Sequence, residues 1–311
     1  MSGLRITQPG LLSLLQDGGR FGHHRIGLSN GGPLDPQAFY WANRLCDNPT
    51  NSSCVEITIG GLSLEAELAT QIAVTGAEVV LTINGQPRPL WQTHAIKPGD
   101  QLTVGFAKQG CRAYLSVTGG FRAPLQFGSS ATVVREGIGG LHGTPLQPGD
   151  LLPCQPSTDH RQQRLEHRFQ PQYSNNATLR VVPGYQVDQF PSLEQRRFYS
   201  SEYQLSEHCD RMGYRLQGAA IRSSISAMLS EGICLGAIQI PADGQPIVLM
   251  NDRQTIGGYP KIGSVISQDL GKLAQLRPGD TVQFEPISIE QAHSLHCLHR
   301  DRLKRIPLTP C

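Results

Sequence analysis

The stretch Ile238–Ser264 reads IQIPADGQPIVLMNDRQTIGGYPKIGS. Its apolar run Ile247–Met250 has the length and the β-branched content of a buried strand, and the turn Ala242-Asp243-Gly244 before it is typical of a hairpin. The run ends in the five polar residues 251–255, followed by Gly257-Gly258, where the backbone can approach a ligand closely. A rigid strand that ends in a polar cluster beside glycines is typical of a binding site, although a plain polar loop fits the same spacing.

Composition predicts a β-rich protein with many turns. The chain has 311 residues, enough for two domains or two lobes of one. It contains 34 glycines and 22 prolines, a share well above the average of about 12%, and only 17% charged residues. The formal net charge of +2 gives no electrostatic argument for nucleic acid or for an acidic membrane surface.

Cysteine usage and hydropathy indicate a cytoplasmic protein. The eight cysteines are scattered and form no C-x-x-C pair, so reduced thiols are expected rather than a disulfide framework. No apolar run approaches the length of a membrane span, so no membrane partner is expected. Metal-ligand spacings are missing as well, and the adjacent pair His23-His24 alone is too few ligands, so no metal is predicted.

Local signals predict several elements further along the chain. Asp35 is suited to cap a helix that has Pro36 at its first position and ends near Asn48. Asn84-Gly85 predicts a hairpin, and Ser267 is placed to cap a short helix. Three x-Pro-Gly-Asp turns begin at Lys97, Gln147 and Arg277, and each precedes a short apolar stretch, as in a β-barrel-like architecture that reuses one turn type.

Two further clusters have chemistry that the spacing leaves open. Arg211 and Arg215 lie four residues apart around Gly213-Tyr214 and could clamp a carboxylate or phosphate, but surface ion pairs fit equally. The glycine cluster Gly137–Gly140 could cradle an anion, although no helix pattern follows it and the dinucleotide fingerprint is not met. The chain also has no P-loop, no G-x-S-x-G elbow and no H-E-x-x-H motif.

Four stretches together resemble one family. They are Gln16–Arg20, Gly32–Asp35 with Ala42-Asn43, Asp210–Leu216, and Gly244–Lys261. These residues are similar to the family named for allophanate hydrolase subunit 2, which includes the C subunit of bacterial 5-oxoprolinase and the antagonist of a sporulation kinase inhibitor. They also match the first half of the carboxyltransferase region of urea carboxylase. The resemblance covers roughly residues 4–290.

The resemblance implies a mainly β fold with a few short helices, in a cyclophilin-like β-barrel architecture of two subdomains. The expected division is a carboxyltransferase-like subdomain at 1–155, a linker at 156–177, a cyclophilin-like subdomain at 178–290 and a polar tail at 291–311. The resemblance further implies a partner similar to allophanate hydrolase subunit 1, the B subunit of 5-oxoprolinase, and a separate A subunit. With these partners the chain would convert 5-oxoproline to glutamate at the expense of ATP. ATP would be shared with the partner, and this chain has no biotin-carrier Met-Lys-Met.

Residue chemistry then selects the candidate site. Activation of an amide requires a carboxylate or polar group near the amide and cations for developing charge. We predict catalytic roles for Asp252, Lys261 and Gln254. We predict substrate-binding roles for six further residues, namely Thr255, Tyr259, Arg211, Tyr214, Asp35 and Asn43.

Two alternatives stay open beside an ATP-dependent hydrolase acting on a cyclic amide. One is a carboxyltransferase component that acts on a urea-like or amide substrate and depends on other polypeptides for biotin and ATP. The other is a non-catalytic antagonist of a kinase inhibitor, for which Asp252 and Lys261 would be dispensable.

Overall fold

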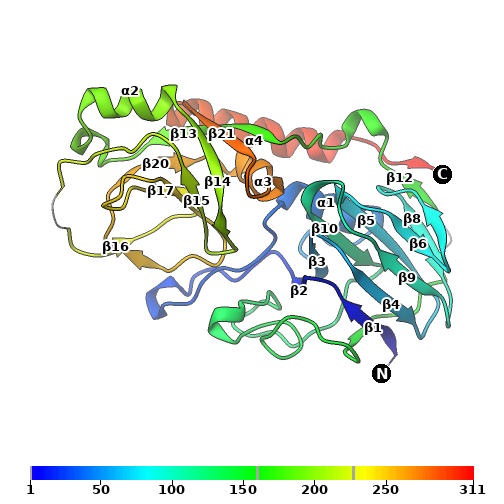
Figure 1. Cartoon of the computed structure of the whole chain (residues 1–311). Helices are drawn as coiled ribbons and strands as arrows, with labels where there is room; N and C mark the ends of the chain where they lie inside the picture. The colour runs from blue at the N-terminus through cyan, green and yellow to red at the C-terminus, as the bar shows by residue number, and fades with distance from the viewer. Residues whose placement is uncertain (1, 159–160, 226–227) are drawn as a thin grey trace. The chain divides into compact units, whose positions relative to one another are not determined.

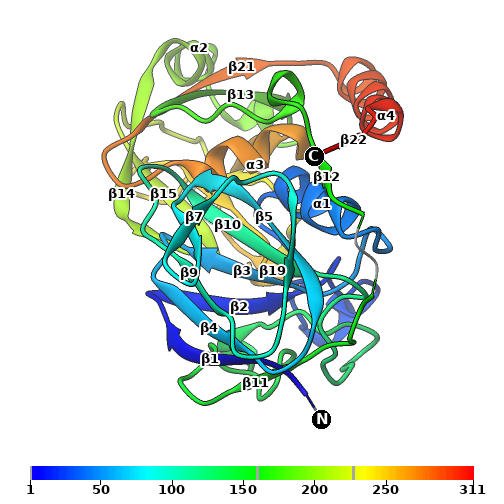
Figure 2. The ribbon, with the colours of Figure 1, turned by 90° about the vertical axis from the view of Figure 1, so that its right-hand side faces the viewer.

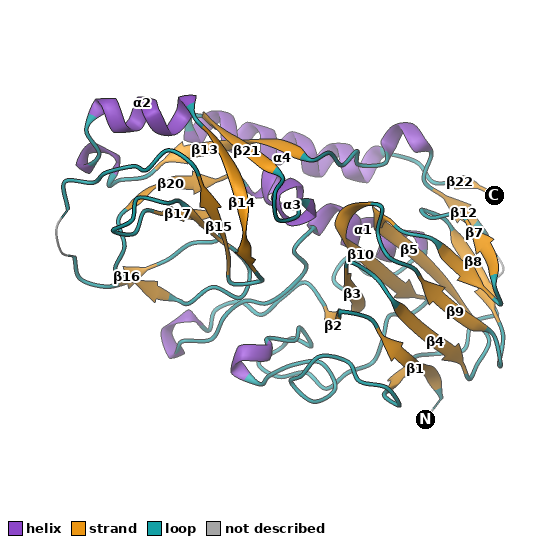
Figure 3. Ribbon diagram, in the orientation of Figure 1, coloured by secondary structure: helices purple, strands orange, loops and turns teal. Residues whose placement is uncertain are grey.

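The computed structural model describes residues 2–158, 161–225 and 228–311. Strands predominate over helices (Figure 3). The chain forms two compact units. Unit 1 consists of Met1–Phe21, Asn30–Tyr173 and Ile306–Cys311, and unit 2 consists of Gly22–Ser29 and Ser174–Arg305 (Figure 1).

The passage from unit 1 to unit 2 falls between Tyr173 and Ser174, inside the region 156–177 that was predicted as a linker. Most of that region is part of unit 1, where β12 (Gln163–Arg164) pairs with β22 (Thr309–Pro310). The segment 291–311, predicted as a polar tail, contains most of helix α4 (Ile289–Arg305) as well as β22. A division in chain order therefore misplaces two segments, because residues 22–29 belong to unit 2 and residues 306–311 belong to unit 1.

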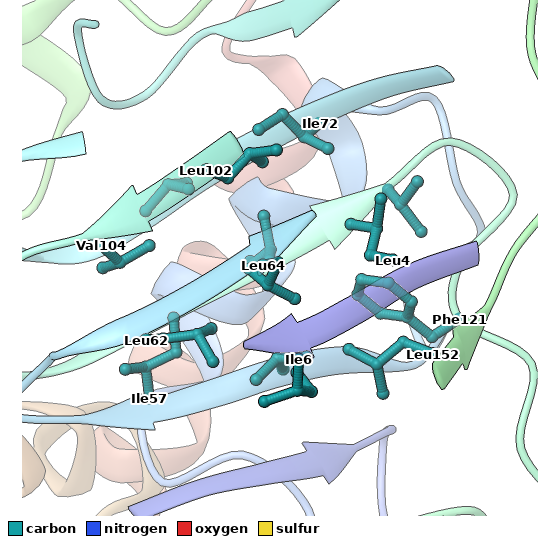
Figure 4. Packing of buried hydrophobic residues seen from close by; sticks show 14 of the residues in the cluster. Leu4, Ile6, Ile57, Leu62, Leu64, Ile72, Leu102, Val104, Phe121 and Leu152 are labelled. Carbon is teal, nitrogen blue, oxygen red and sulfur yellow. The ribbon is translucent and has the colours of Figure 1, made fainter. Parts of the chain in front are cut away.

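Unit 1 is built on two antiparallel sheets. The six-stranded sheet has the order β11 (Leu151–Pro153), β1 (Gly3–Pro9), β4 (Leu62–Ala66), β9 (Gln101–Val104), β6 (Leu81–Ile83) and β7 (Gln86–Arg88). The five-stranded sheet has the order β2 (Leu12–Gln16), β3 (Cys54–Thr58), β10 (Gln109–Val117), β5 (Thr70–Glu78) and β8 (Thr93–Ile96). Alternating side chains of both sheets enter one apolar core (Figure 4), which contains Ile6, Leu64 and Leu102 from the first sheet and Ile57 and Ile72 from the second.

Helix α1 (Pro36–Leu45) lies against β5 and β10 of unit 1, as Figure 2 shows. Its start is as predicted, with Pro36 in the first turn and the Asp35 carboxylate accepting from the backbone N–H groups of Gln37 and Ala38 at 3.1 and 3.0 Å. This cap satisfies two donors that the first turn leaves without an intrahelical partner. The helix then buries its apolar stripe, including Ala38 and Phe39, on the sheet.

The predicted turns are confirmed. Asn84-Gly85 joins β6 to β7 with both residues at positive φ. In each x-Pro-Gly-Asp turn, glycine has φ between 86° and 93°, and the aspartate side chain accepts from the backbone N–H of the first residue at 2.8–2.9 Å. The carboxylate thereby closes the turn, and the next residue opens β9, β11 or β21 (Thr281–Pro286).

Unit 2 contains a closed seven-stranded barrel. The strand order is β13 (Asn176–Pro183), β20 (Lys261–Val265), β17 (Ala237–Gln239), β18 (Ile247–Leu249), β15 (Gly213–Gln217), β14 (Glu202–Cys209) and β21. Neighbouring strands are antiparallel except β13 and β21, which are parallel. Closure removes exposed sheet edges, and the mainly β fold with a barrel confirms the predicted fold class.

Helices and a ribbon complete unit 2. Helix α2 (Ser192–Ser200) packs on β21, where Phe198 stacks on Phe284 with ring centroids 4.5 Å apart. Helix α3 (Ser267–Gln275) packs on β13. The predicted Ser267 cap is wrong: Ile266 occupies the cap position, without a side-chain hydrogen bond, and Ser267 is already helical. The strands β16 (Glu231–Gly232) and β19 (Ile256–Gly257) form a separate ribbon.

Four short 3-10 helices lie in the described part of the chain, at His24–Ile26, Val134–Glu136, His167–Phe169 and Val187–Gln189. Among the helices of residues 2–158, 161–225 and 228–311, none is both long enough and apolar enough to cross a membrane.

Candidate functional site

The stretch that follows β18 is held by backbone pairing with the segment before β15. The N–H of Met250 donates to the carbonyl of Met212, and the N–H of Asp252 donates to the carbonyl of Arg211, both at 2.8 Å. These bonds continue the β15–β18 ladder beyond the assigned strands. The two ends of the ladder therefore place the side chains of Arg211 and Asp252 opposite each other.

Arg211 and Asp252 form a bidentate ion pair. Arg211 Nε donates to one carboxylate oxygen and an Nη to the other, both at 2.9 Å, and each side chain is only 7% exposed. The sequence predicts a catalytic role for Asp252 and a substrate-binding role for Arg211. The structure brings the two together, and each neutralises the charge of the other. Such a planar fork geometry fixes both side chains.

Lys261 is the centre of a second polar group. Its ammonium is ion-paired with the Glu231 carboxylate, which also accepts from Gln186 Nε2 at 2.8 Å. The Gln186 side chain in turn accepts from the backbone N–H of Lys261 at 2.8 Å. Hydrogen bonds from Lys261 and then Tyr185 hold the pKa of Glu231 below its ordinary value. The bond to Glu231 in turn raises the pKa of Tyr185.

Three predicted site residues keep their side chains available. Gln254 and Thr255 are partly exposed and Tyr259 is 49% exposed. Within the residues that the structure describes, these three side chains make no hydrogen bond or ion pair. An amide, a hydroxyl and a phenol group can each bind a ligand without first breaking an internal contact. Gly258 in the same loop is exposed, whereas Gly257 lies in β19 against the side chains of Ile233 and Gln239.

Tyr214 and the two residues of unit 1 have contacts of another kind. Tyr214 lies on β15, 1% exposed, and its hydroxyl donates to the carbonyl of Ala274 at 3.5 Å. Asp35 caps α1 and accepts from the Tyr173 hydroxyl at 2.7 Å. Asn43 is buried and donates to the carbonyl of Ser52 at 2.9 Å. These contacts position local backbone, and their predicted role toward substrate stays a prediction.

The glycine cluster at 137–140 is closed, so the suggested anion cradle there is wrong. The N–H of Gly139 donates to the Gln126 side chain at 2.8 Å, and that of Gly140 donates to the carbonyl of Ser130 at 2.7 Å. A nest needs free N–H groups that point outward. Among the described residues, no three His, Cys, Asp or Glu side chains gather to hold a metal ion.

Sequence reasoning missed four polar residues of this region. Gln186 and Tyr185 are separated from Lys261 by most of unit 2, and Glu231 reaches it because β16 pairs with β19. Arg253 is 4% exposed and its Nε donates to the carbonyl of Ile233 at 3.3 Å. Burial lowers the pKa of Arg253. No spacing in the sequence links Tyr185, Gln186 or Glu231 to Lys261, because only folding brings these distant segments together, whereas Arg253 belongs to the polar run 251–255.

The chain is similar to proteins of known name over nearly its whole length. A family model described as carboxyltransferase domain, subdomain A and B, matches residues 26–286. The C subunit of 5-oxoprolinase from Escherichia coli is 38% identical over 290 residues, which are 93% of each chain. The C subunit from Haemophilus influenzae is 37% identical over 94% of each chain.

A solved structure agrees with these relatives. The Kluyveromyces lactis urea carboxylase superposes with a TM-score of 0.91 at 29% identity. The match covers 98% of this chain but only 29% of the urea carboxylase chain. This chain therefore corresponds to less than a third of that larger protein. The resemblance predicted from the motifs is confirmed: the chain is similar to 5-oxoprolinase C subunits and belongs to the family described as carboxyltransferase domain, subdomain A and B.

Proposed function

We propose that this chain is the C subunit of an ATP-dependent 5-oxoprolinase, which acts with a B subunit and a separate A subunit to convert 5-oxoproline to glutamate. One observation carries the proposal. The match to the Escherichia coli C subunit covers 93% of both chains, whereas the match to urea carboxylase covers 29% of that protein. The proposed reaction opens a cyclic amide by hydrolysis, and its place is the cytoplasm.

The geometry supports a division of labour among the predicted residues. Gln254, Thr255 and Tyr259 have side chains without internal partners in the described structure, and we assign them to the substrate, with Gln254 and Thr255 at its amide. Asp252 and Lys261 are each ion-paired. We propose that these two ion pairs act as fixed dipoles beside the loop, where preorganised polar groups stabilise developing charge without reorganisation.

Two features support a nucleotide site that is shared with the partner subunits. The closed glycine cluster at 137–140 offers no phosphate cradle, and Arg211 and Lys261 are already paired with carboxylates. We therefore propose that the partner subunits supply most of the nucleotide site. No step through ATP is assigned to residues of this chain.

The proposal is tested by mixing this chain with its partner A and B subunits and measuring ATP-dependent release of glutamate from 5-oxoproline. We expect turnover that requires all three chains. Gln254→Ala should lower turnover about tenfold or more, because the lost side chain contacts the reacting amide. Its unfolding free energy should change by less than about 0.5 kcal/mol, as for an unpaired surface residue.

A matched control is Gln283→Ala on β21. Gln283 is also a glutamine without a side-chain hydrogen bond in the described structure, and it lies outside the 251–261 loop. Its removal should leave turnover unchanged. If both variants turn over equally, Gln254 does not belong to the site. If a stable wild-type complex shows no turnover, the 5-oxoprolinase proposal itself is refuted.

Carboxyl transfer is the second candidate, favoured by the close superposition on the urea carboxylase. It would require a biotin carrier from another polypeptide. The distinguishing measurement is transfer of labelled carboxyl from a carboxylated carrier protein to urea in the presence of this chain and the B subunit. Label in a urea product, without glutamate release from 5-oxoproline, would favour this alternative.

A further inference from the structure

A cavity of about 670 Å³ lies in unit 2 beside the candidate site. Three segments build it, namely the loop that follows β15, the turn between β17 and β18, and the end of the loop before β20. Its volume is within the range of small-molecule sites, roughly 300–1,000 Å³. Tyr259, predicted to bind substrate, is part of its wall.

The walls of this cavity combine apolar and polar side chains. Ile221, Ile240, Pro241 and Pro260 contribute to them, together with the ring of Tyr259. Ile221 and Ile240 are 1% and 2% exposed, so the barrel holds them firmly in place. Gly244 has φ of 75°, and an added Cβ would lie 2.8 Å from the backbone of Ile221, so the turn and the loop can approach this closely only with glycine there.

Arg222 brings an unbalanced positive charge to the cavity. Its side chain makes no hydrogen bond or ion pair with any residue that the structure describes. The neighbouring carboxylate, Glu194, is already occupied, since it accepts from Arg197 at 2.9 Å and from the backbone N–H of Arg222 at 2.9 Å. The backbone of Arg222 is thus anchored while its guanidinium stays available.

The remaining charged wall residue, Asp243, has partners of its own. It forms an ion pair with Arg215 at 3.5 Å and accepts from the backbone N–H of Gln245 at 3.1 Å. Its negative charge is therefore balanced outside the cavity. The Tyr259 hydroxyl has no partner in the described structure and adds a neutral hydrogen-bonding group. Among the described wall residues, the cavity thus offers one available cation and one phenol beside its apolar side chains, while the Ser223 hydroxyl is hydrogen-bonded to Gln189 and Ile225.

We propose that this cavity binds a small organic carboxylate, with Arg222 pairing with the carboxyl group and Tyr259 with Pro260 covering the apolar part. A guanidinium matches a carboxylate with two parallel hydrogen bonds, which gives both affinity and orientation. The inference rests on the proposed function for its named ligand, since 5-oxoproline carries one carboxyl group on a compact ring. The cavity would then hold the substrate by its carboxyl group and leave the ring amide for other groups.

The test measures equilibrium binding of two ligands to the folded full chain by ligand-observed saturation-transfer NMR. The ligands are 5-oxoproline and its neutral analogue 2-pyrrolidone. We expect the acid to bind at least about tenfold more tightly than the analogue, because the analogue lacks one charge-assisted interaction and a difference of this size is typical of such an interaction. Arg222→Gln should weaken binding of the acid by the same factor and leave binding of the analogue unchanged.

The control is Arg300→Gln on α4, which removes the same charge from the same unit but does not line the cavity. It should bind like the wild type, and all variants should keep the wild-type melting temperature. Equal binding of the acid by Arg222→Gln and the wild type would overturn the proposal, as would a wild type that binds no 5-oxoproline at all.

Kinetics of the reconstituted complex separate this inference from the proposed function. If the complex turns over 5-oxoproline, Arg222→Gln should raise KM about tenfold with kcat little changed, because the carboxyl group binds equally in the ground and transition states. Turnover with an unchanged KM would overturn the cavity assignment and leave the function standing. If 5-oxoproline binding depends on Arg222 but the complex shows no turnover, the cavity assignment would stand and the proposed function would fail.

Discussion

In unit 1 the polar side chains of the motif Gln16–Arg20 form hydrogen bonds within the protein, whereas several side chains in the 251–261 loop of unit 2 stay available for a ligand. Gln16 accepts from the N–H of Gly32 and donates to the carbonyl of Thr132, both at 2.9 Å. Asp17 accepts from the N–H of Ser130 at 2.7 Å and from the Ser129 hydroxyl. The motif thereby fastens one loop to another.

Both regions belong to the stretches that carry the family resemblance, so the presence of a motif alone does not separate structural from functional polar groups. What separates them is whether a buried partner exists. A buried carboxylate that accepts several hydrogen bonds is costly to disturb, while an exposed side chain without a partner costs the fold little. Asp252 shows that both kinds occur within the 251–261 loop, since it is as buried and as paired as Asp17.

The largest effect is expected from Asp252→Ala. It leaves the Arg211 guanidinium buried without its carboxylate, and breaking such a pair costs about 3–5 kcal/mol of the free energy of unfolding. Urea unfolding of the variant measures this loss. The double variant Asp252→Ala/Arg211→Met should recover part of this loss, because it also removes the buried charge that the Asp252 carboxylate balances. If Asp252→Ala is as stable as the wild type, the Asp252 side chain is not needed by the fold and belongs with the available side chains of the 251–261 loop.

A smaller loss of stability is expected from Asp17→Asn. The neutral amide still accepts one hydrogen bond but presents an NH₂ group where Asp17 accepts from Ser129 or Ser130, so we expect a loss of about 1–3 kcal/mol. Thermal unfolding monitored by circular dichroism gives the value. Glu65→Gln on β4, an exposed carboxylate to amide change in the same unit, is the control and should be neutral. If Asp17→Asn is neutral as well, the contrast between the two regions fails.

The smallest effect concerns the pH response of Glu231. Because Lys261 and Tyr185 lower its pKa in the folded chain, the stabilisation by this pair is present above the ordinary carboxyl pKa and is lost as the pH falls through the lowered value. Carbon-detected NMR titration of the Glu231 carboxyl group should show a midpoint below that of an exposed glutamate. The midpoint should rise in Lys261→Met. A midpoint that does not move would mean that the ion pair is not formed in solution.

Local signals carried most of the secondary structure. The Asp35-Pro36 cap, the Asn84-Gly85 hairpin and the x-Pro-Gly-Asp turns each depend on residues within four positions of one another. Backbone conformation there is fixed by side chains that are near in sequence, so the pattern is enough to predict it. The Ser267 cap failed because the helix starts at Ser267 itself, which leaves Ile266 in the cap position.

The sequence was enough to select candidate residues but not to predict their contacts. Sequence alone selected the 251–261 loop, the segment around Arg211 and the family to which the chain belongs. Only the tertiary structure paired Arg211 with Asp252, brought Glu231 and Gln186 to Lys261, and left Arg222 without a partner among the described residues, in the cavity that Tyr259 also lines. The physical reason is that strand pairing, in the barrel and in the β16–β19 ribbon, joins segments far apart in the chain, and a charge is neutralised or left available according to the neighbours that this pairing supplies.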